Sequence, residues 1–385
     1  MDKNGFDTAC TGSLIPTLGN RKAFVPHPLP PLHLDLNSVL PILSRATQAV
    51  GELKGIGRTI PNPLLLIRPL QRREAVSSSS MEGTYTTLND LFLFEAGGNI
   101  PDRIAENREV LNYVRALERS INDLDKLPIS ARLIKNAHKM LLSGVAKHRG
   151  AQVEAGEFKR DQNWIGGSGT IETARFIPAT PQATPDAIDE LMGFINREDS
   201  NKSSPLIDAA MAHYQFEAIH PFGDGNGRVG RMLIALMLVE NDTLPQPLLY
   251  MSPWLERNKD RYIDLMFEVS RAGEWAPWIE FFLLAVAESA EETIRVVQRM
   301  QDLQKEYRER FQTARRSALM LRIIDLAFER PMRSISDIAQ ELDVTYAGAA
   351  NNVNELLRQG VAEEVPYSYP KLIRFPKIME AMRID

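Results

Sequence analysis

Residues 220–231 read HPFGDGNGRVGR, which places a histidine, a carboxylate and two arginines around closely spaced glycines. Glycines let successive backbone N–H groups converge into a concave anion site. A helix expected to begin near Gly227 adds unpaired donors and a partial positive charge. Arg228 and Arg231 are three residues apart and share one face of its first turn. Alone, Asp-Gly-Asn-Gly more often marks a flexible turn, but these flanking residues favour a phosphate-binding loop.

The charged side chains of this segment add the chemistry of phosphoryl or nucleotidyl transfer. His220 carries an imidazole, a group suited to removing a proton from an attacking hydroxyl. Asp224 offers a carboxylate that can bind Mg²⁺ beside phosphates, and guanidinium groups bind phosphate oxygens bidentately. No Gly-Lys-Ser/Thr follows the glycines, which excludes a Walker A loop. The preceding segment has a helical pattern, which disfavours a dinucleotide-binding fingerprint.

The segment resembles the Fic motif, HPFx(D/E)GNGRxxR, and matches it at every specified position. The resemblance implies a helical core that transfers AMP from ATP, with Mg²⁺, to a Tyr, Thr or Ser hydroxyl of a target protein. It implies His220 as general base, Phe222 as the anchor of the loop and Asp224 as the Mg²⁺ ligand. The ATP contacts that it implies come from Phe222, Gly223, Asp224, Gly225, Asn226, Gly227, Arg228 and Arg231. Relatives that phosphorylate carry Lys where this chain has Gly227, so AMP transfer is favoured over a kinase reaction.

Residues 78–83 read SSSMEG and resemble the family's inhibitory motif, (S/T)xxxE(G/N), with Ser78, Glu82 and Gly83 at the specified positions. The pattern is loose and also fits a serine-rich helix cap, but its place before a complete Fic motif favours inhibition. The resemblance implies that Glu82 pairs with Arg231, the partner of the γ-phosphate. ATP would then bind in a non-productive pose. The same carboxylate could instead position a water that removes AMP from modified targets, and the sequence leaves both open.

Two further segments are assigned by the same resemblance. Residues 162–167 and 174–178 are predicted as two short strands around a Gly/Ser turn, similar to the family's flap, whose edge pairs with an extended segment of the target. The expected docking residues are Trp164, Ile165, Gly166, Gly167, Phe176 and Ile177. Asn258 and Tyr262 resemble the region that contacts adenine, with an ordinary surface-helix position as the equal alternative.

The elements that position these segments are predicted to be mainly helical. Apolar spacings of three and four predict helices over 37–53, 103–126, 129–142, 208–219 and 229–239, and a long helix from 278 towards 316. The proline-rich residues 1–40 are expected to be extended and to lie over the body. The predicted fold is therefore mainly α: a Fic helical core with a β-hairpin flap, plus a C-terminal winged-helix domain.

Three parts are expected along the chain: an N-terminal arm and inhibitory-helix region (1–100), the catalytic core (101–316) and the winged helix (317–385). In the last part, helices over 335–342 and 346–357 followed by a hairpin over 361–375 predict the winged helix. A DNA-binding regulator is therefore an alternative function. Residues 320–385 contain eight Lys/Arg and ten Asp/Glu, a balance that argues against DNA binding. A protein partner or another subunit is expected there, with a homodimer left open.

Composition is that of an ordinary globular chain of 385 residues, with 44% hydrophobic residues and a net charge of −5. This charge gives no global attraction to nucleic acid or to an anionic membrane. Cys10 is the only cysteine, which excludes an intrachain disulfide and a zinc site built from several cysteines. No apolar stretch resembles a signal peptide or spans a bilayer. A cytoplasmic location is expected.

Overall fold

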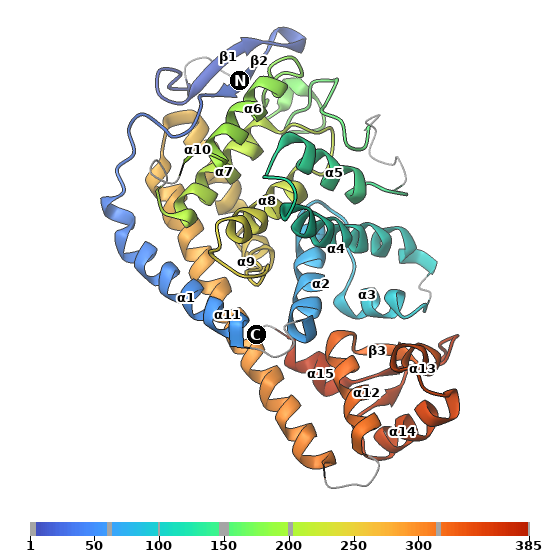
Figure 1. The fold of residues 1–385 in the computed structure, drawn as a ribbon. Coiled ribbons are helices and arrows are strands. Elements are labelled where there is room, and N and C mark those ends of the chain that lie inside the picture. The colour runs from blue at the N-terminus through green and yellow to red at the C-terminus, as the bar shows by residue number, and fades with distance from the viewer. Residues whose placement is uncertain are drawn as a thin grey trace.

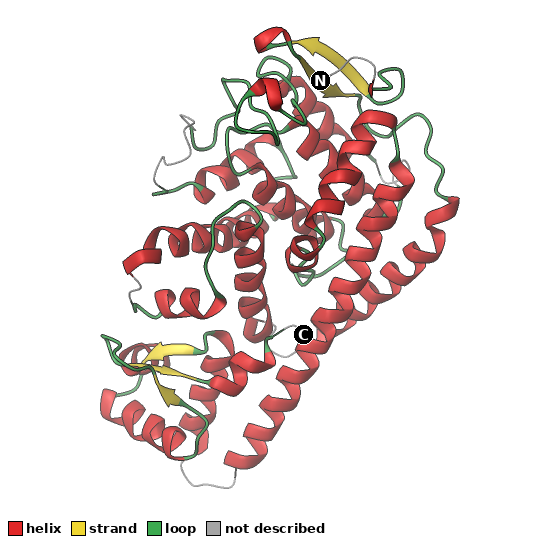
Figure 2. Cartoon of the chain, turned by 180° about the vertical axis from the view of Figure 1, so that it is seen from behind, coloured by secondary structure: helices red, strands yellow, loops and turns green. Residues whose placement is uncertain are grey.

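The structure is a computed structural model that describes residues 5–59, 64–98, 101–145, 154–198, 203–312 and 317–383. Helices make up most of this part of the chain (Figures 1 and 2). No helix in the described ranges is both long enough and apolar enough to cross a membrane. The mainly α architecture predicted from the apolar spacing is confirmed.

The centre of the molecule is the helix pair α7 (Pro205–Ile219) and α8 (Asn226–Glu240), which pack against each other and flank the glycine-rich loop. Nearly every side chain of α7 is buried, as expected for a helix that is apolar on all sides. Around the pair lie α4 (Ile104–Leu124), α5 (Ala131–Leu141), α6 (Thr184–Ile195), α9 (Ser252–Arg257), α10 (Lys259–Ala272) and α11 (Trp275–Phe311). The loop therefore sits on a rigid helical scaffold.

Most predicted helices agree with the structure to within a few residues at their ends, namely α4, α5, α7 and α8. The helix predicted over 37–53 is α1 (Leu40–Thr59), which is longer, packs along α11, and follows a 3-10 turn (Asn37–Val39). The long helix α11 ends at Phe311, and residues 313–316 lie outside the described ranges. Apolar spacing gave no bounds for α2 (Leu64–Ser80), α3 (Leu88–Glu95), α6 or α10, although an inhibitory helix was expected within residues 1–100. A 3-10 turn (Pro101–Arg103) leads into α4.

The N-terminal arm is extended and lies over the body, as expected, but it also forms a β-ribbon that was not predicted. Strands β1 (Gly12–Pro16) and β2 (Lys22–Pro26) pair antiparallel, with Gly12 opposite Pro26, around a 3-10 turn (Leu18–Asn20). Prolines stand at the strand ends, where a missing N–H is tolerated. The N–H of Asp7 donates to the carbonyl of Arg271 at 2.7 Å, which ties the arm to the end of α10.

The predicted pair of flap strands is reduced to a single antiparallel bridge between Ile165 and Phe176. Gly166 and Gly167 have φ values of 71° and 84°, and this left-handed backbone turns the chain away directly after the bridge. A 3-10 turn (Ile171–Thr173) fills the connection. We keep the name flap for residues 162–178.

The C-terminal block contains α12 (Ser317–Glu329), β3 (Met332–Ser334), α13 (Ile335–Leu342), α14 (Tyr346–Arg358), β4 (Glu363–Glu364), β5 (Leu372–Arg374) and α15 (Pro376–Ala381). The three strands form one antiparallel sheet in the order β3-β5-β4. A capping box of Ser334 and Asp337 begins α13. The two predicted helices and the hairpin are thus present.

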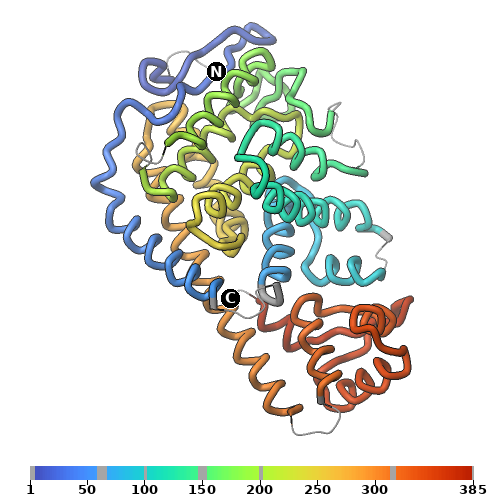
Figure 3. Tube along the Cα trace, in the orientation of Figure 1, coloured from blue at the N-terminus to red at the C-terminus, as the bar shows by residue number. Residues whose placement is uncertain are grey.

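The C-terminal block packs on two helices of the rest of the chain. α12 lies against α2, and the chain then returns so that α15 lies against α11 (Figure 3). α2 also packs against α4 and α9. α2 therefore lies between the helical core and the C-terminal block, and its last residues are those that precede Glu82.

Candidate active site

The backbone at the start of the loop is strained and firmly held. His220 follows α7 in the left-handed region, with φ 52° and ψ 60°, a conformation that costs energy for a residue with a side chain. Lys159 Nζ donates to the carbonyls of Ile219 at 3.0 Å and His220 at 2.9 Å. Asn163 Nδ2 donates to the carbonyls of His220 at 3.1 Å and Phe222 at 2.9 Å. These two side chains therefore fix the start of the loop.

We expect Lys159→Met to lower the free energy of unfolding by about 1–3 kcal/mol, because the Ile219 carbonyl loses this donor and the His220 carbonyl keeps only Asn163. Lys159 is buried, and its ammonium group also reaches Asn163 Oδ1 at 2.9 Å. Urea unfolding followed by circular dichroism measures the change, with Lys139→Met at an exposed position of α5 as the matched control. Equal unfolding midpoints for the two variants would contradict the role of Lys159 in fixing the start of the loop.

The turn of the loop is closed by its own side chains. Asn226 Oδ1 accepts the N–H of Phe222 at 2.8 Å, and its Nδ2 donates to the carbonyl of Phe222 at 2.8 Å. The fully buried Phe222 ring stacks on the His138 ring with 3.9 Å between centroids. His138 Nε2 donates to the carbonyl of Asp224 at 3.0 Å, and burial lowers the pKa of His138 to about 4. A neutral ring therefore supports the loop from α5.

Arg231 on α8 contacts two residues of the 78–83 segment, Ser78 and Glu82. Its Nε donates to Ser78 Oγ at 2.8 Å, and its Nη2 donates to the carbonyl of Ser78 and to Glu82 Oε1, each at 2.8 Å. Gly83 follows with φ 84° and turns the chain after the carboxylate. A Cβ at Gly227 would lie 2.0 Å from Glu82 Oε1, so this glycine makes room for the ion pair.

The Glu82–Arg231 pair is charged at neutral pH. Burial alone would raise the pKa of Glu82, but the charge and hydrogen bond of Arg231 outweigh it and hold that pKa below its usual value. The Arg231 side chain is 3% exposed and that of Glu82 is 29% exposed. A charge-assisted contact at this burial is stronger than a surface ion pair.

His220 is set up as a neutral base. Its Nδ1 lies 3.3 Å from the carbonyl of Glu217; because a carbonyl only accepts, Nδ1 carries the proton and Nε2 carries the lone pair. Burial, and next the charge of Lys159, lowers the pKa of His220 to about 4. The imidazole is therefore unprotonated near pH 7, as a general base must be.

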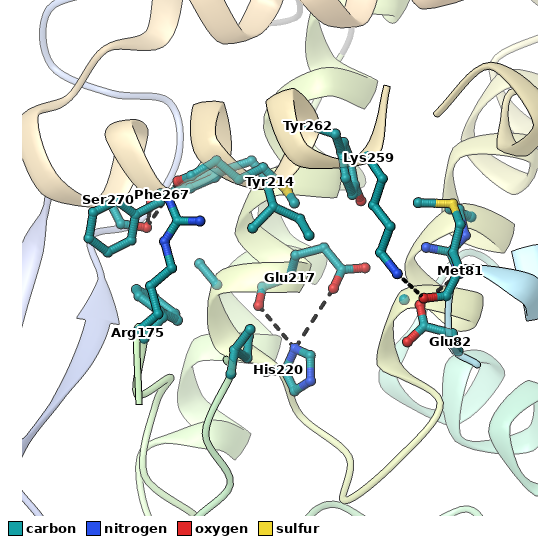
Figure 4. A pocket seen from close by; sticks show the side chains of 17 residues that line it. Met81, Glu82, Arg175, Tyr214, Glu217, His220, Lys259, Tyr262, Phe267 and Ser270 are labelled. Carbon is teal, nitrogen blue, oxygen red and sulfur yellow. Dashed lines mark hydrogen bonds and ion pairs between the residues drawn. The ribbon is translucent and has the colours of Figure 1, made fainter. Parts of the chain in front are cut away.

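These groups open on one cavity of about 270 Å³. Figure 4 shows His220 and Glu217 in its middle, with Glu82 and Lys259 on one side and Arg175 and Phe267 on the other. The side with Glu82 and Lys259 also carries Met81 and Tyr262, and the side with Phe267 also carries the charged Arg175. The remaining lining residues include Gly227 and Arg231 of α8 and the apolar Ile165, Phe176, Ile263 and Met266. Charged groups beside the base, together with several apolar and aromatic lining side chains, suit a ligand with a charged end and an aromatic end.

Comparison with protein families assigns the loop. The Fic/DOC family N-terminal profile matches residues 40–122, and the Fic/DOC family profile matches residues 128–238, which include the whole motif. Together the two profiles cover half of the chain. The chain belongs to the Fic/DOC family. We refer to residues 220–231 as the Fic loop from here on.

Two groups of relatives show how far the likeness extends. The protein adenylyltransferase Fic of Culex quinquefasciatus is 29% identical over 197 residues, 50% of this chain and 34% of the relative. The protein adenylyltransferase fic-1 of Caenorhabditis elegans is 28% identical over 207 residues, 53% and 36%. This chain thus matches about a third of the length of these curated relatives.

Solved structures share the fold. A Fic family protein from Desulfovibrio desulfuricans G20 has a TM-score of 0.56 at 20% identity and covers 89% of this chain and 98% of its own. A fragment of Fic-1 from Caenorhabditis elegans has a TM-score of 0.53 at 21% identity and covers 68% and 74%. The helical core around α7 and α8 is therefore a Fic fold.

Arg228 does not reach the cavity, although the motif implied a phosphate contact. Its side chain is fully buried and pairs with Glu109 of α4, and its Nη2 lies 3.6 Å from Asp224 Oδ1. Arg228 thus ties the first turn of α8 to α4. Of the two arginines, only Arg231 lines the cavity.

Asp224 is the carboxylate of the Fic loop that fits a metal. Its Oδ1 accepts the N–H of Gly225 at 2.7 Å, and its side chain is 26% exposed. In the described ranges, no cluster of three or more His, Cys, Asp or Glu forms a complete metal site. One carboxylate is nevertheless enough for Mg²⁺, which proteins often bind through one or two carboxylates together with substrate phosphates.

The two residues expected near adenine are placed differently. Tyr262 lines the cavity, and its buried hydroxyl donates to His213 Nε2 at 2.7 Å. Asn258 lies between α9 and α10, where its Nδ2 donates to the carbonyl of Trp254 at 2.9 Å. Asn258 is not among the residues that line the cavity, so the structure brings only Tyr262 there.

The flap residues also divide into two sets. Ile165 and Phe176 line the cavity, while Gly166, Gly167 and Trp164, which is 37% exposed, face outward. Ile177 is fully buried, and its carbonyl accepts the N–H of Phe24 from β2 at 2.8 Å. The expected docking role of Ile177 is therefore wrong, because the N-terminal arm already covers it.

Sequence reasoning missed the groups that support His220. Glu217 stands three residues before His220 on the predicted helix, so helical spacing could have identified it as a neighbour. Lys159 and Asn163 lie about sixty residues away in the chain, where no local pattern indicates the contact. His138 is packed against the Fic loop, and its place on a helix predicted over 129–142 gives no local sign of that contact.

Proposed function

We propose that this chain is a self-inhibited protein adenylyltransferase that transfers AMP from ATP to a Tyr, Thr or Ser hydroxyl of a target protein, and of itself. The observation that carries the proposal is that a neutral His220 and a buried Arg231 open on the same cavity, while Glu82 occupies Arg231. The printed names of the curated relatives, protein adenylyltransferases, support the same activity.

The cavity suggests how ATP lies. The phosphates are placed at the N-terminus of α8, beside Gly227, where backbone N–H groups and the helix dipole favour anions, with the γ-phosphate at Arg231. Mg²⁺ held by Asp224 would neutralise charge on the phosphates. The adenine ring is placed against the apolar lining residues Ile165 and Phe267, because a flat aromatic base gains most from apolar contact.

Residues of the chain then take two roles, accepting a proton and holding the base in place. His220 Nε2 accepts the proton of the acceptor hydroxyl while the oxygen attacks the α-phosphorus. The bond from that phosphorus to the bridging oxygen of pyrophosphate breaks, and pyrophosphate leaves. Lys159 and Asn163 hold His220 in its left-handed conformation throughout, so that the base does not have to be positioned during the reaction. The target is proposed to dock along the exposed part of the flap.

Self-inhibition follows from the position of Glu82. Its carboxylate takes the guanidinium that the γ-phosphate needs, and its charge repels the triphosphate at short range. With the γ end displaced, the α-phosphate is misaligned for in-line attack. The enzyme becomes active when Glu82 leaves Arg231.

Mass spectrometry tests the proposed reaction. Glu82→Gly is incubated with ATP, and modified chains are analysed intact and after digestion. Adducts of AMP on a hydroxyl residue are expected. Adducts of phosphate alone would overturn AMP transfer in favour of a kinase reaction, and no adduct on the chain or on proteins of a cell extract would overturn the transferase activity.

Ser78→Ala should activate the enzyme partly. It removes the bond from Arg231 Nε to Ser78 Oγ, which helps to hold the guanidinium against Glu82. The Glu82–Arg231 pair should therefore weaken, and we expect AMP transfer to rise by roughly 2- to 10-fold, the equivalent of one hydrogen bond. Ser79→Ala is the matched control, since Ser79 is equally buried and its Oγ has no hydrogen-bond partner in the described residues. Transfer that rises equally in both variants would mean that loosening α2, and not freeing Arg231, activates the enzyme.

Removal of AMP from modified proteins remains the second candidate, because the Glu82 carboxylate lines the cavity and could orient a water there. Wild type incubated with a target already modified by Glu82→Gly should then release AMP, and Glu82→Gln should not.

The C-terminal block is proposed to be a winged helix that contacts protein. Binding of a DNA duplex that strengthens at low salt would instead support a DNA-binding regulator.

A further inference from the structure

The carboxyl group of Glu217 has no evident structural task. Its side chain is 12% exposed and lines the cavity, and Oε1 is buried with no hydrogen-bond partner in the described part of the chain. Oε2 lies 3.7 Å from His220 Nδ1 (Figure 4). Burying a carboxyl oxygen without a hydrogen-bond partner costs free energy. A carboxyl group buried in this way at the cavity therefore suggests a role in the reaction.

The neighbouring helix provides room for this carboxyl group. A Cβ at Gly230 of α8 would lie 2.3 Å from Glu217 Oε1, so any other residue at 230 would displace it. The backbone carbonyl of Glu217 already receives Nδ1–H of His220 at 3.3 Å. One residue thus presents two oxygens to the same imidazole nitrogen, one neutral and one that can be charged.

We propose that Glu217 is a positioning residue for His220, whose carboxylate takes over the Nδ1–H when the imidazole becomes protonated during AMP transfer. This inference rests on the proposed function and adds a residue that neither the Fic motif nor the inhibitory motif contains. Carboxylates support histidine bases in this way in hydrolases, where they fix the tautomer and stabilise the imidazolium.

The step balances without another reactant. The hydroxyl proton moves to His220 Nε2, the acceptor oxygen bonds to the α-phosphorus, and the bond to pyrophosphate breaks. His220 is then an imidazolium whose Nδ1–H points at the Glu217 carboxylate. After product leaves, Nε2 loses its proton to water and His220 returns to the neutral state.

The surrounding charges decide when Glu217 can act. Groups that face the pair are Lys159 and Asp224 from the loops, Arg231 from α8, Tyr262 from α10 and Glu82 after α2. Burial raises the pKa of Glu217 to about 8, an effect that Arg231 opposes and Glu82 strengthens. In the inhibited state the carboxyl is therefore mostly protonated at pH 7. Loss of the Glu82 charge removes one of the causes that raise this pKa and so favours the carboxylate.

Rates measured against pH test the proposal in the Glu82→Gly background. With Glu217 intact, kcat should rise with pH as the carboxyl ionises. Glu82→Gly/Glu217→Gln should lose at least about tenfold in kcat at pH 8, with an unchanged KM for ATP. Its rate should be flat between pH 6 and 9, because His220 stays neutral there. Glu217→Asp should restore part of the pH dependence.

A buried glutamate away from the cavity provides the matched control. Glu292→Gln on α11 changes a carboxylate that pairs with Arg257, and it should leave kcat and the pH profile as they are in Glu82→Gly. A Glu217→Gln double variant that keeps the kcat and the rise with pH would overturn the proposal.

Histidine NMR separates this inference from the proposed function. In full-length chain with ¹⁵N-labelled histidine, the His220 signal is assigned by its absence in His220→Ala and titrated without ATP. In the Glu82→Gly background, the His220 Nδ1 signal should shift between pH 6 and 9 as the Glu217 carboxyl ionises, and Glu217→Gln should abolish this shift. If the His220 signal does not shift, the proposed role of Glu217 is wrong even where AMP transfer is intact. If the signal shifts in a chain that transfers no AMP, the contact between Glu217 and His220 holds and the proposed function is wrong.

Discussion

Glu82→Gly should raise AMP transfer by roughly 10- to 100-fold over wild type, because hydrogen bonds to charged groups are worth about 1.5–3 kcal/mol and about 1.4 kcal/mol corresponds to tenfold. The variant frees Arg231 for the γ-phosphate and removes a negative charge from the cavity. Arg231 keeps its bonds to Ser78 Oγ and to the Ser78 carbonyl, so the guanidinium should stay in place. Initial rates of incorporation from ATP labelled at the α-phosphate measure the effect.

The matched control is a glutamate that also sits in a turn and pairs with an arginine. Glu154→Gly breaks the exposed pair with Arg160, away from the cavity, and its transfer rate should equal that of wild type. A Glu82→Gly rate no higher than that of Glu154→Gly would remove the basis for self-inhibition. An equal rise in both would point to general loosening of the chain.

Release of Glu82 is expected to involve the turn after α2 more than the helix itself. Glu74 is buried in α2 and accepts the N–H of Ser252 at 2.9 Å, which ties the helix to α9. Lys259 Nζ donates to the carbonyl of Met81 at 2.6 Å and so holds the last turn from α10. Beyond it, the left-handed Gly83 is exposed. A small change at residues 81–83 therefore displaces the carboxylate, whereas moving α2 would disrupt buried contacts on several sides.

The sequence predicted those parts of the site whose residues lie within one short motif. A complete motif places a histidine before, and an arginine after, a turn between two helices, and helical spacing brings them to one cavity. The second motif predicted which carboxylate meets Arg231, and the structure places Ser78 and Glu82 on that guanidinium. In both cases the residue types and their spacing carry the chemistry.

Features decided by distant contacts could not be predicted in this way. The spacing of Arg228 and Arg231 predicts that both lie on one helix face. Arg228 is instead buried in the core, because it pairs with Glu109, more than a hundred residues earlier in the chain. Ile177 fits a flap strand, but the N-terminal arm covers it. Two short segments around a Gly/Ser turn suggest paired strands, but two left-handed glycines end the pairing after the single bridge at Ile165.

His220→Ala in the Glu82→Gly background should reduce AMP transfer by about 10²–10⁴-fold, the usual contribution of a general base. Without an imidazole, the hydroxyl must lose its proton to water, while Arg231 and the N-terminus of α8 still bind ATP. Affinity for ATP should therefore change little, and only the rate of the chemical step should fall. Single-turnover transfer and equilibrium ATP binding measure the two quantities separately.

His33→Ala, at an exposed position of the N-terminal arm, is the control for loss of a histidine and should transfer AMP like its parent. Removal of His220 also leaves Lys159 and Asn163 their backbone acceptors, so the left-handed turn should persist and the unfolding midpoint should stay close to that of Glu82→Gly. A collapse of ATP binding would mean that His220 shapes the Fic loop. Transfer that continues at the parental rate would show that another group takes the proton, and among the cavity residues Glu217 would be the nearest candidate.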